Sequence, residues 1–282
     1  MSTQSAALQP GAAGTSRIAF TRPGRLRGEQ IFTMRPDGSD LRQLTGGAGQ
    51  GSNWGPAWSP DGGRICFSSD RNGHAHLYLI APDGSARQQL TNDPAASDFE
   101  PGWSPDGARI AFARGDDSAD DLWLVEVATG EAHPLTSEGR LDGSPAWSPD
   151  GRWIVFHRAL GSPSGLYTIP AAGGEARFLA SGTHPSWAIG GGDIAFAHGG
   201  SLWLLGMTAD GTTDGRARLL VCSAQMVIGG SSWSPDGGAL VFETQVTDAS
   251  GMRDRLMLVS VEGGEPRDLG PGYQPNWSPR PR

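Results

Sequence analysis

The sequence predicts an all-β protein, a six-bladed β-propeller with four antiparallel strands in each blade. One observation is a tryptophan that recurs every 40–46 residues, and a spacing of about 40–45 residues is typical of propeller blades. The recurring residues are Trp58, Trp103, Trp147, Trp187, Trp233 and Trp277. Two more observations support this fold: an apolar segment that recurs in register with the tryptophans, and two chain ends that complete each other.

The first strand of each repeat ends in the tryptophan and a tight turn. Ser59-Pro60-Asp61-Gly62 suits such a turn, because proline fixes φ and glycine adopts a positive φ. Related turns stand at 104–107, 148–151 and 234–237, whereas the fifth repeat has Ala188-Ile189-Gly190-Gly191 instead. Repetition of the turn aspartate predicts that it caps its own backbone and has no acid–base role.

The second strand has a large residue, a small residue and a phenylalanine in order. The six segments are 18–20, 65–67, 110–112, 154–156, 194–196 and 240–242. Alternate residues of a strand face opposite sides, so each sheet has a bulky apolar face and a small apolar face. We expect the bulky face of one blade to interdigitate with the small face of its neighbour.

The third and fourth strands complete each blade. Third strands are predicted at 31–34, 77–80, 122–125, 166–169, 202–205 and 256–259. Fourth strands are predicted at 41–45, 86–91, 132–136, 176–180, 217–221 and 266–270. Turn chemistry such as Pro36-Asp37-Gly38 and Gly173-Gly174 joins the two strands.

The chain ends predict how the ring closes. The first copy starts at Arg17 with the second-strand pattern, and the last copy stops soon after Trp277-Ser278-Pro279. Residues 273–279 therefore supply the missing first strand of blade one, which leaves no open sheet edge where the ends meet. We expect residues 1–16 to be a flexible tail and residues 17–282 to form one propeller domain.

Composition excludes several classes of function. The net charge is −8 and all 22 basic residues are arginine, so there is neither a Schiff-base lysine nor a lysine-containing phosphate loop. An acidic chain without a basic run is a poor nucleic-acid binder. No apolar run reaches the roughly 18 residues of a membrane span, so no membrane insertion is expected.

The cysteines and the first residues bear on the compartment. Cys66 and Cys222 fall in blades two and five, on opposite sides of the ring, which predicts that they do not form a disulfide. Residues 1–15 lack the pattern of a secretory signal. We expect a cytoplasmic monomer, with a periplasmic or secreted location as the alternative.

The repeated motifs resemble those of a known family. Residues 56–62, with Pro-Ala-Trp-Ser-Pro-Asp-Gly, the segments 64–67 and 77–80, and Pro82-Asp83-Gly84 closely resemble the TolB-type propeller repeat, across residues 17–279. The resemblance implies protein–protein contact in a bacterial envelope system. A similar propeller gates prolyl-oligopeptidase-like peptidases, but neither the TolB N-terminal domain nor a peptidase domain fits into this chain. The repeat carries no catalytic residue that can be transferred.

The candidate site is one mouth of the central channel. The loops that lead into the innermost strands are 46–57, 92–102, 137–146, 181–186, 222–232 and 271–276. The predicted ligand-binding residues in these loops are Trp54, Asp98, Phe99, Glu100, Asp142, His184 and Tyr273. Carboxylates, an imidazole and aromatic rings at one mouth suit a cation, a sugar or a basic peptide.

Three functions remain open from the sequence. The first, which we favour, is a non-enzymatic interaction module that presents the mouth to a protein or peptide. The second is a glycan or small-ligand binder. The third is a metal-dependent lyase or hydrolase that uses channel carboxylates. We expect no resident cofactor, with a divalent cation in the channel as the alternative.

Overall fold

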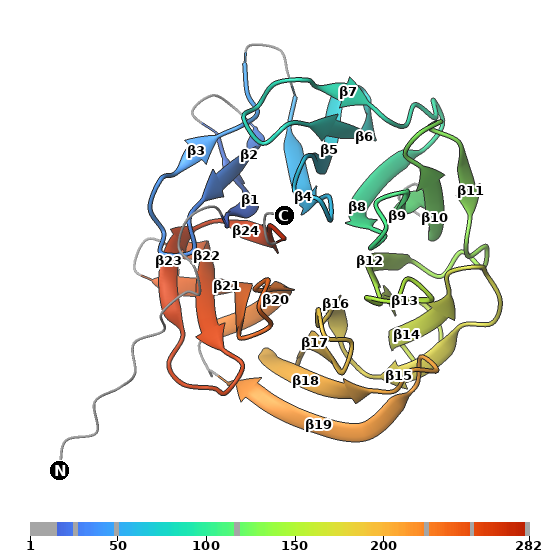
Figure 1. Ribbon diagram of the computed structural model, residues 1–282, viewed down its shortest axis with the longest axis vertical. Coiled ribbons are helices and arrows are strands. Elements are labelled where there is room, and N and C mark those ends of the chain that lie inside the picture. Colours follow the sequence, from blue (N-terminus) through green and yellow to red (C-terminus); the bar gives the residue numbers. More distant parts are fainter. Residues whose placement is uncertain are drawn as a thin grey trace.

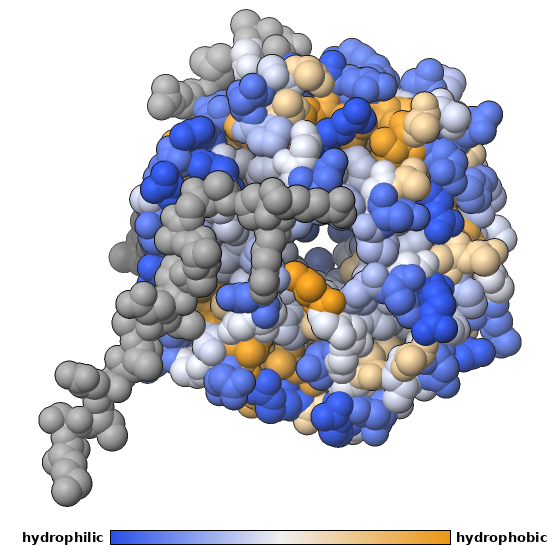
Figure 2. Space-filling model, viewed as in Figure 1, coloured by the Kyte–Doolittle hydropathy of each residue, from blue (hydrophilic) through white to orange (hydrophobic). Residues whose placement is uncertain are grey.

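A computed structural model of the chain describes residues 16–24, 28–47, 51–115, 119–222, 226–248 and 251–279. The described strands form six four-stranded sheets arranged around a central channel (Figure 1). The prediction of a six-bladed, all-β propeller is therefore confirmed. Figure 2 shows the channel as an opening at the centre of one face.

Each blade has an inner strand beside the channel and a second strand paired with it. The inner strands, in blade order, are β24 (Tyr273–Trp277), β4 (Asn53–Trp58), β8 (Ser97–Trp103), β12 (Asp142–Trp147), β16 (Thr183–Trp187) and β20 (Met226–Trp233). The second strands are β1 (Ile18–Pro23), β5 (Ile65–Asn72), β9 (Arg109–Gly115), β13 (Trp153–Arg158), β17 (Asp193–His198) and β21 (Ala239–Asp248).

The third and outer strands complete the sheets toward the rim. The third strands are β2 (Glu29–Met34), β6 (His74–Ile80), β10 (Asp120–Glu126), β14 (Gly165–Pro170), β18 (Ser201–Met207) and β22 (Gly251–Ser260). The outer strands are β3 (Arg42–Gln43), β7 (Gln88–Gln89), β11 (Ala132–Pro134), β15 (Arg177–Ala180), β19 (Thr213–Val221) and β23 (Arg267–Pro271). Most outer strands are shorter than the sequence predicts, whereas β19 begins four residues before its predicted start and runs along the rim.

The core lies between blades, as the alternation of large and small residues predicts. Ala19 of blade one packs with Ile65 and Phe67 of blade two, and all three are buried. At the ring closure, Val241 of blade six packs with Ile18 and Phe20 of blade one. The same arrangement of a small residue against the next blade's large pair recurs at the other four junctions. Each junction is thus a separate apolar cluster.

The repeated tryptophans reinforce these junctions. The Nε1–H of Trp103 donates to the carbonyl of Ala57 in the preceding blade, 3.0 Å away. Trp147 repeats the bond with Gly102 at 3.0 Å. In blade five, which lacks the Ser-Pro-Asp-Gly turn, Trp187 donates to Gly191 in its own turn instead. Five of the six, all except Trp103, are buried, as packing between blades requires.

The C-terminal strand closes the ring as predicted. Strand β24 pairs with β1, with Trp277 opposite Ile18 and Asn276 opposite Ala19. Beyond the strands, the Ser278 N–H donates to the carbonyl of Arg17 at 2.8 Å, and the Arg17 N–H donates to Oγ of Ser278 at 2.8 Å. Residues near the two ends thus lie in one sheet.

The turns and cysteines also agree with the prediction. Ser59 donates to the Asp61 carboxylate at 2.6 Å, and the Gly63 N–H donates to the same oxygen at 2.9 Å. These hydrogen bonds lower the pKa of Asp61, the serine contributing most. Cys66 and Cys222 are unpaired. Burial raises the pKa of the Cys66 thiol.

Candidate functional site

Six equivalent residues surround one end of the channel, each three positions before a repeated tryptophan. We call them the channel ring: Gly55, Glu100, Ser144, His184, Gly230 and Gln274. All six line a cavity of about 440 Å³ that follows the channel. Because the inner strands run in the same direction along the channel, the ring lies at one mouth and the Ser-Pro-Asp-Gly turns lie at the other.

The ring residues sit at irregularities in the pairing of the inner strands. In blade three, for example, the register of β8 against β9 shifts between Phe99 and Gly102. Glu100, Ser144, His184 and Gln274 have φ values of 54°, 51°, 50° and 50°, in the left-handed region. A β-bulge redirects a side chain, and a non-glycine residue in this conformation costs about 1–3 kcal/mol. The same strained backbone therefore recurs in four blades, around the channel.

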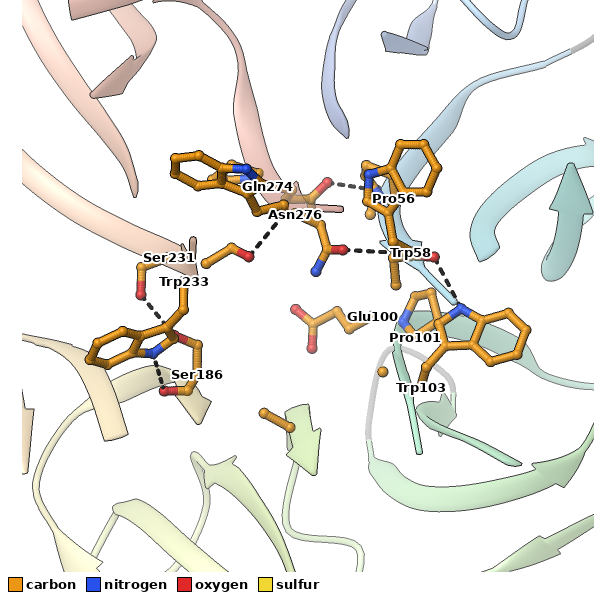
Figure 3. Close-up of a pocket in the computed structure, with 18 of the residues that line it drawn as sticks. Pro56, Trp58, Glu100, Pro101, Trp103, Ser186, Ser231, Trp233, Gln274 and Asn276 are labelled. Atoms are coloured by element: carbon orange, nitrogen blue, oxygen red, sulfur yellow. Dashed lines mark hydrogen bonds between the residues drawn. The ribbon is translucent and has the colours of Figure 1, made fainter. Parts of the chain in front are cut away.

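Hydrogen bonds link the ring residues across blade junctions. Oε2 of Glu100 accepts from the Ser144 N–H at 2.6 Å, and Oε1 of Gln274 accepts from the Gly55 N–H at 2.9 Å. A side chain of one blade thus caps a backbone donor of the next blade. Figure 3 shows the Glu100 carboxylate pointing toward the open centre, with the indoles of Trp103 and Trp233 turned back between the blades.

In blade six the acceptor that caps the next blade comes from outside the ring position. Its ring position is Gly230, and Glu243 of the adjacent strand β21 supplies the carboxylate that accepts from the Gln274 N–H. A Cβ atom at Gly229 would come within 2.1 Å of Oε1 of Glu243. The glycine at 229 therefore leaves the space that the Glu243 side chain occupies.

A second cavity of about 300 Å³ adjoins the ring, with lining residues from blades one to five. We call it the side cavity, and its lining residues are Trp54, Phe99, Glu100, Ala113, Asp120, Leu141, Asp142, Gly143, Ser144, His157, His184 and Gln274. The rings of Trp54 and Phe99 are stacked with their centroids 6.4 Å apart. Four ring residues line both cavities, so the side cavity and the channel meet at the ring.

Five of the predicted site residues line the side cavity. They are Trp54, Phe99, Glu100, Asp142 and His184. Tyr273 lines the channel cavity and also a third cavity of about 330 Å³ that includes Glu29 and Asp70. Trp54 and Gln274 line both of these cavities.

Two of the predicted residues, Asp98 and Asp142, are committed to buried ion pairs. Asp98 is fully buried and accepts from Nε and Nη2 of Arg114 at 2.6 and 3.0 Å. Asp142 is also fully buried and accepts from Arg158 twice at 2.7 Å. Asp98 lines none of the three cavities, and Asp142 lines the side cavity with its charge already balanced. The expectation that both carboxylates converge openly on the mouth is therefore corrected.

Ser144, His157, Gln274 and Glu243 line the cavities but are not among the predicted ligand-binding residues. The sequence carries a signal for Ser144 and Gln274. The ring residue directly precedes a proline in five repeats, as in Ser144-Pro145-Ala146-Trp147. This position varies, whereas the proline after it and the tryptophan three residues on recur. No comparable signal marks His157 or Glu243, which reach the site from second strands.

His157 is the imidazole set deeper in the side cavity. Burial lowers its pKa below 6.5, the nearby His184 lowers it further, and Glu100 and Asp142 oppose the change. His157 is therefore neutral at pH 7. His184 is exposed, and its Nδ1 lies 3.0 Å from Oγ1 of Thr183.

Two further observations concern metals and membranes. Across the described ranges, no three His, Cys, Asp or Glu side chains are grouped so that they could hold a metal ion. Those ranges also contain no helix with the length and apolar character of a membrane span.

The chain is similar in sequence to two curated bacterial proteins. The Tol-Pal system protein TolB of Syntrophus aciditrophicus is 34% identical over 80 residues, which are 27% of this chain and 17% of that protein. An uncharacterised protein of Agrobacterium fabrum is 37% identical over 62 residues, which are 22% of this chain and 20% of that protein. The matches thus span about a fifth of these relatives.

Solved structures share the fold. TolB from Acinetobacter baumannii superposes with a TM-score of 0.77 at 20% identity, over 94% of this chain and 67% of that chain. An oligogalacturonate lyase in complex with manganese superposes with a TM-score of 0.60 at 16% identity, over 87% and 71% of the two chains. At these identities the likeness is one of fold alone.

A family model settles the wider relationship. The model of the TolB β-propeller domain matches residues 83–280, well over half of the chain. The resemblance noted in the repeats is therefore confirmed, and the chain belongs to the TolB β-propeller domain family.

Proposed function

We propose that this propeller is a non-enzymatic interaction module that binds a protein or peptide at the mouth formed by the channel ring. The observation that carries the proposal is the recurrence of a left-handed backbone at Glu100, Ser144, His184 and Gln274. Strained backbone that persists in a folded protein is a motive for a functional hypothesis. Here it sets four chemically different side chains around one opening, each directly followed by a proline.

The chemistry of the mouth supports recognition of an extended segment. The channel cavity of about 440 Å³ has proline and tryptophan walls and offers polar groups at the ring. Ligand sites combine apolar walls with a few placed polar groups in this way. The relation to a Tol-Pal system protein, TolB, also suits a protein partner.

The same relation supports a proposal for the compartment. The family resemblance implies an envelope system, so we place the protein in the periplasm, the alternative location, in preference to the cytoplasm. Fractionation of the source cells with a compartment marker tests this assignment.

Glycan binding is the second candidate, and the Trp54–Phe99 stack is the observation that favours it. Aromatic faces also bind sugars, and both rings line the side cavity. A glycan array probed with the purified chain and with Trp54→Ala tests this alternative.

The main proposal is tested by selection from a displayed peptide library. Wild type is compared with His184→Glu, which changes an exposed ring residue, and with Ile189→Ser, at the opposite end of the channel. We expect the selected peptides to lose binding to His184→Glu and to keep it with Ile189→Ser. Selection of no peptide, or loss only with Ile189→Ser, contradicts the proposal.

A further inference from the structure

We propose that the side cavity is a socket for one cationic side chain, an arginine or a lysine, of the partner bound at the mouth. This inference rests on the proposed function, because it assigns the chemistry of one contact within that interface. It follows from the aromatic pair, an uncompensated carboxylate and a lining in which the described residues include no arginine.

The aromatic pair provides a favourable surface for a cation. Trp54 comes from β4 of blade two and Phe99 from β8 of blade three, and the stack spans the junction between them. Both side chains are half-buried and line the cavity. A cation within about 6 Å of an aromatic ring is attracted to its face, and tryptophan is the strongest partner.

Glu100 supplies the negative charge. Its Oε2 accepts from the N–H and Oγ–H of Ser144, at 2.6 and 3.3 Å. Its Oε1 has no hydrogen-bond partner among the described residues. These two contacts hold the carboxylate with neutral donors, so that its charge is not balanced by an ion pair. An incoming guanidinium or ammonium group can donate to the remaining oxygen.

The other charged groups of the cavity leave this charge uncompensated. Asp142 is paired with Arg158, and that pair is already balanced. No arginine is among the described lining residues, and burial keeps the pKa of His157 low. An incoming cation therefore meets net negative charge and a neutral imidazole.

The backbone at Glu100 fixes this arrangement. Its φ of 54° and the bulge between Phe99 and Gly102 place the carboxylate at the boundary of the two cavities. Gly143 leaves room for it, because a Cβ there would lie 2.7 Å from Oε2 of Glu100. A partner segment that enters the channel thus passes the carboxylate and can place one side chain in the side cavity.

The direct test uses a small probe that does not depend on the identity of the partner. N-acetyl-arginine amide is titrated into the protein, and the indole N–H resonance of Trp54, assigned with Trp54→Phe, is followed by NMR. The matched probe is N-acetyl-citrulline amide, which has nearly the same shape and no charge. We expect saturable binding of the arginine probe in the millimolar range and at least about tenfold weaker binding of citrulline.

The matched variant is Glu100→Gln, which keeps an acceptor for the Ser144 N–H and removes the charge. We expect this variant to bind the arginine probe about tenfold more weakly than wild type does. The salt dependence of binding should also disappear. Equal binding of the two probes, or unchanged binding to Glu100→Gln, overturns the socket.

The peptide library separates this result from the function itself. Selected peptides that depend on His184 but lack an arginine or lysine leave the interaction module standing and overturn the socket. Binding of neutral oligosaccharides that depends on Trp54 and not on Glu100 likewise overturns the socket in favour of a sugar. Enrichment of basic residues that is lost with Glu100→Gln supports it.

Discussion

The carboxylate of Glu100 and the backbone N–H of Ser144, 2.6 Å apart, join two blades at the mouth of the channel. Both residues occupy the same position of the repeat and share the left-handed conformation. The contact therefore stabilises the junction between the two blades, and it also fixes the position of the carboxylate in the proposed site. Variants at the two residues separate these contributions.

Removal of the Glu100 side chain leaves the Ser144 N–H without its acceptor. We expect Glu100→Ala to lower the free energy of unfolding by about 1–2 kcal/mol, since an unmade hydrogen bond carries a desolvation cost. Glu100→Gln retains an acceptor and should stay within about 0.5 kcal/mol of wild type. Chemical denaturation of the three proteins measures both. Equal loss in the two variants would show that the capping contact adds nothing.

Ser144→Gly should act in the opposite direction. Glycine adopts φ near 51° without the steric cost of a Cβ, and Gly55 already holds this position in blade two with φ of 61°. After the greater chain entropy of glycine is subtracted, we expect a gain of about 0.5–1 kcal/mol. A thermal-unfolding comparison with Ser144→Ala, which keeps the strain, checks the sign. A gain as large in Ser144→Ala contradicts the strain argument.

The ion pair of Asp142 and Arg158 should be costly to break, because both side chains are buried. We expect Asp142→Ala to lower stability by about 3–5 kcal/mol, the cost of an unpaired buried charge. The double variant with Arg158→Ala should lose less than the sum of the single losses. Arg152→Ala, in an exposed pair with Asp150, is the control and should cost about 0.5 kcal/mol. If the stability losses of the two single variants simply add in the double variant, Asp142 and Arg158 are not energetically coupled.

His157 should make stability depend on pH. Its folded pKa lies below the unfolded value of 6.5, so the unfolded chain binds the proton more readily as the pH falls through 6.5. Stability from this residue is complete above pH 6.5 and decreases toward and below the folded pKa. The groups that face it are His184, Glu100, Asp142 and Asp120. The melting temperature of His157→Gln should fall less than that of wild type between pH 8 and pH 5.5; an equal fall contradicts the assignment.

The closing strand should be indispensable for stability. Deletion of residues 273–282 removes β24 and the buried Trp277, and opens blade one. We expect the melting temperature to fall by at least about 10 °C. Removal of residues 280–282 alone is the control and should change it little. An unchanged melting temperature in the longer deletion contradicts closure of the ring by this strand.

The fold could be predicted because its determinants are local and repeated. Ile18-Ala19-Phe20 and its five counterparts encode the packing between blades, and the clusters in the structure follow that pattern. Strand lengths at the rim were less predictable. The outer strands are exposed, so apolar alternation does not mark their ends, and β19 extends back to Thr213 through Arg216 and Arg218.

The site could be predicted only in part, because its chemistry depends on pairing between strands. Asp98 and Asp142 resemble open mouth residues until the register places them opposite Arg114 and Arg158. The loops that precede the inner strands group Trp54, Phe99, Glu100 and His184 at one mouth, and the structure brings these four together in the side cavity. His157 required the fold, since it enters from a second strand.

The binding of a partner at the ring is tested most directly by site-specific photocrosslinking. A benzophenone amino acid replaces His184 in one protein and Ile189, at the far end of the channel, in another. Each protein is irradiated with the strongest library peptide, and the linked residues are identified by mass spectrometry. We predict crosslinks from position 184 and none from position 189. Crosslinks from position 189 alone would contradict the assignment of the binding mouth.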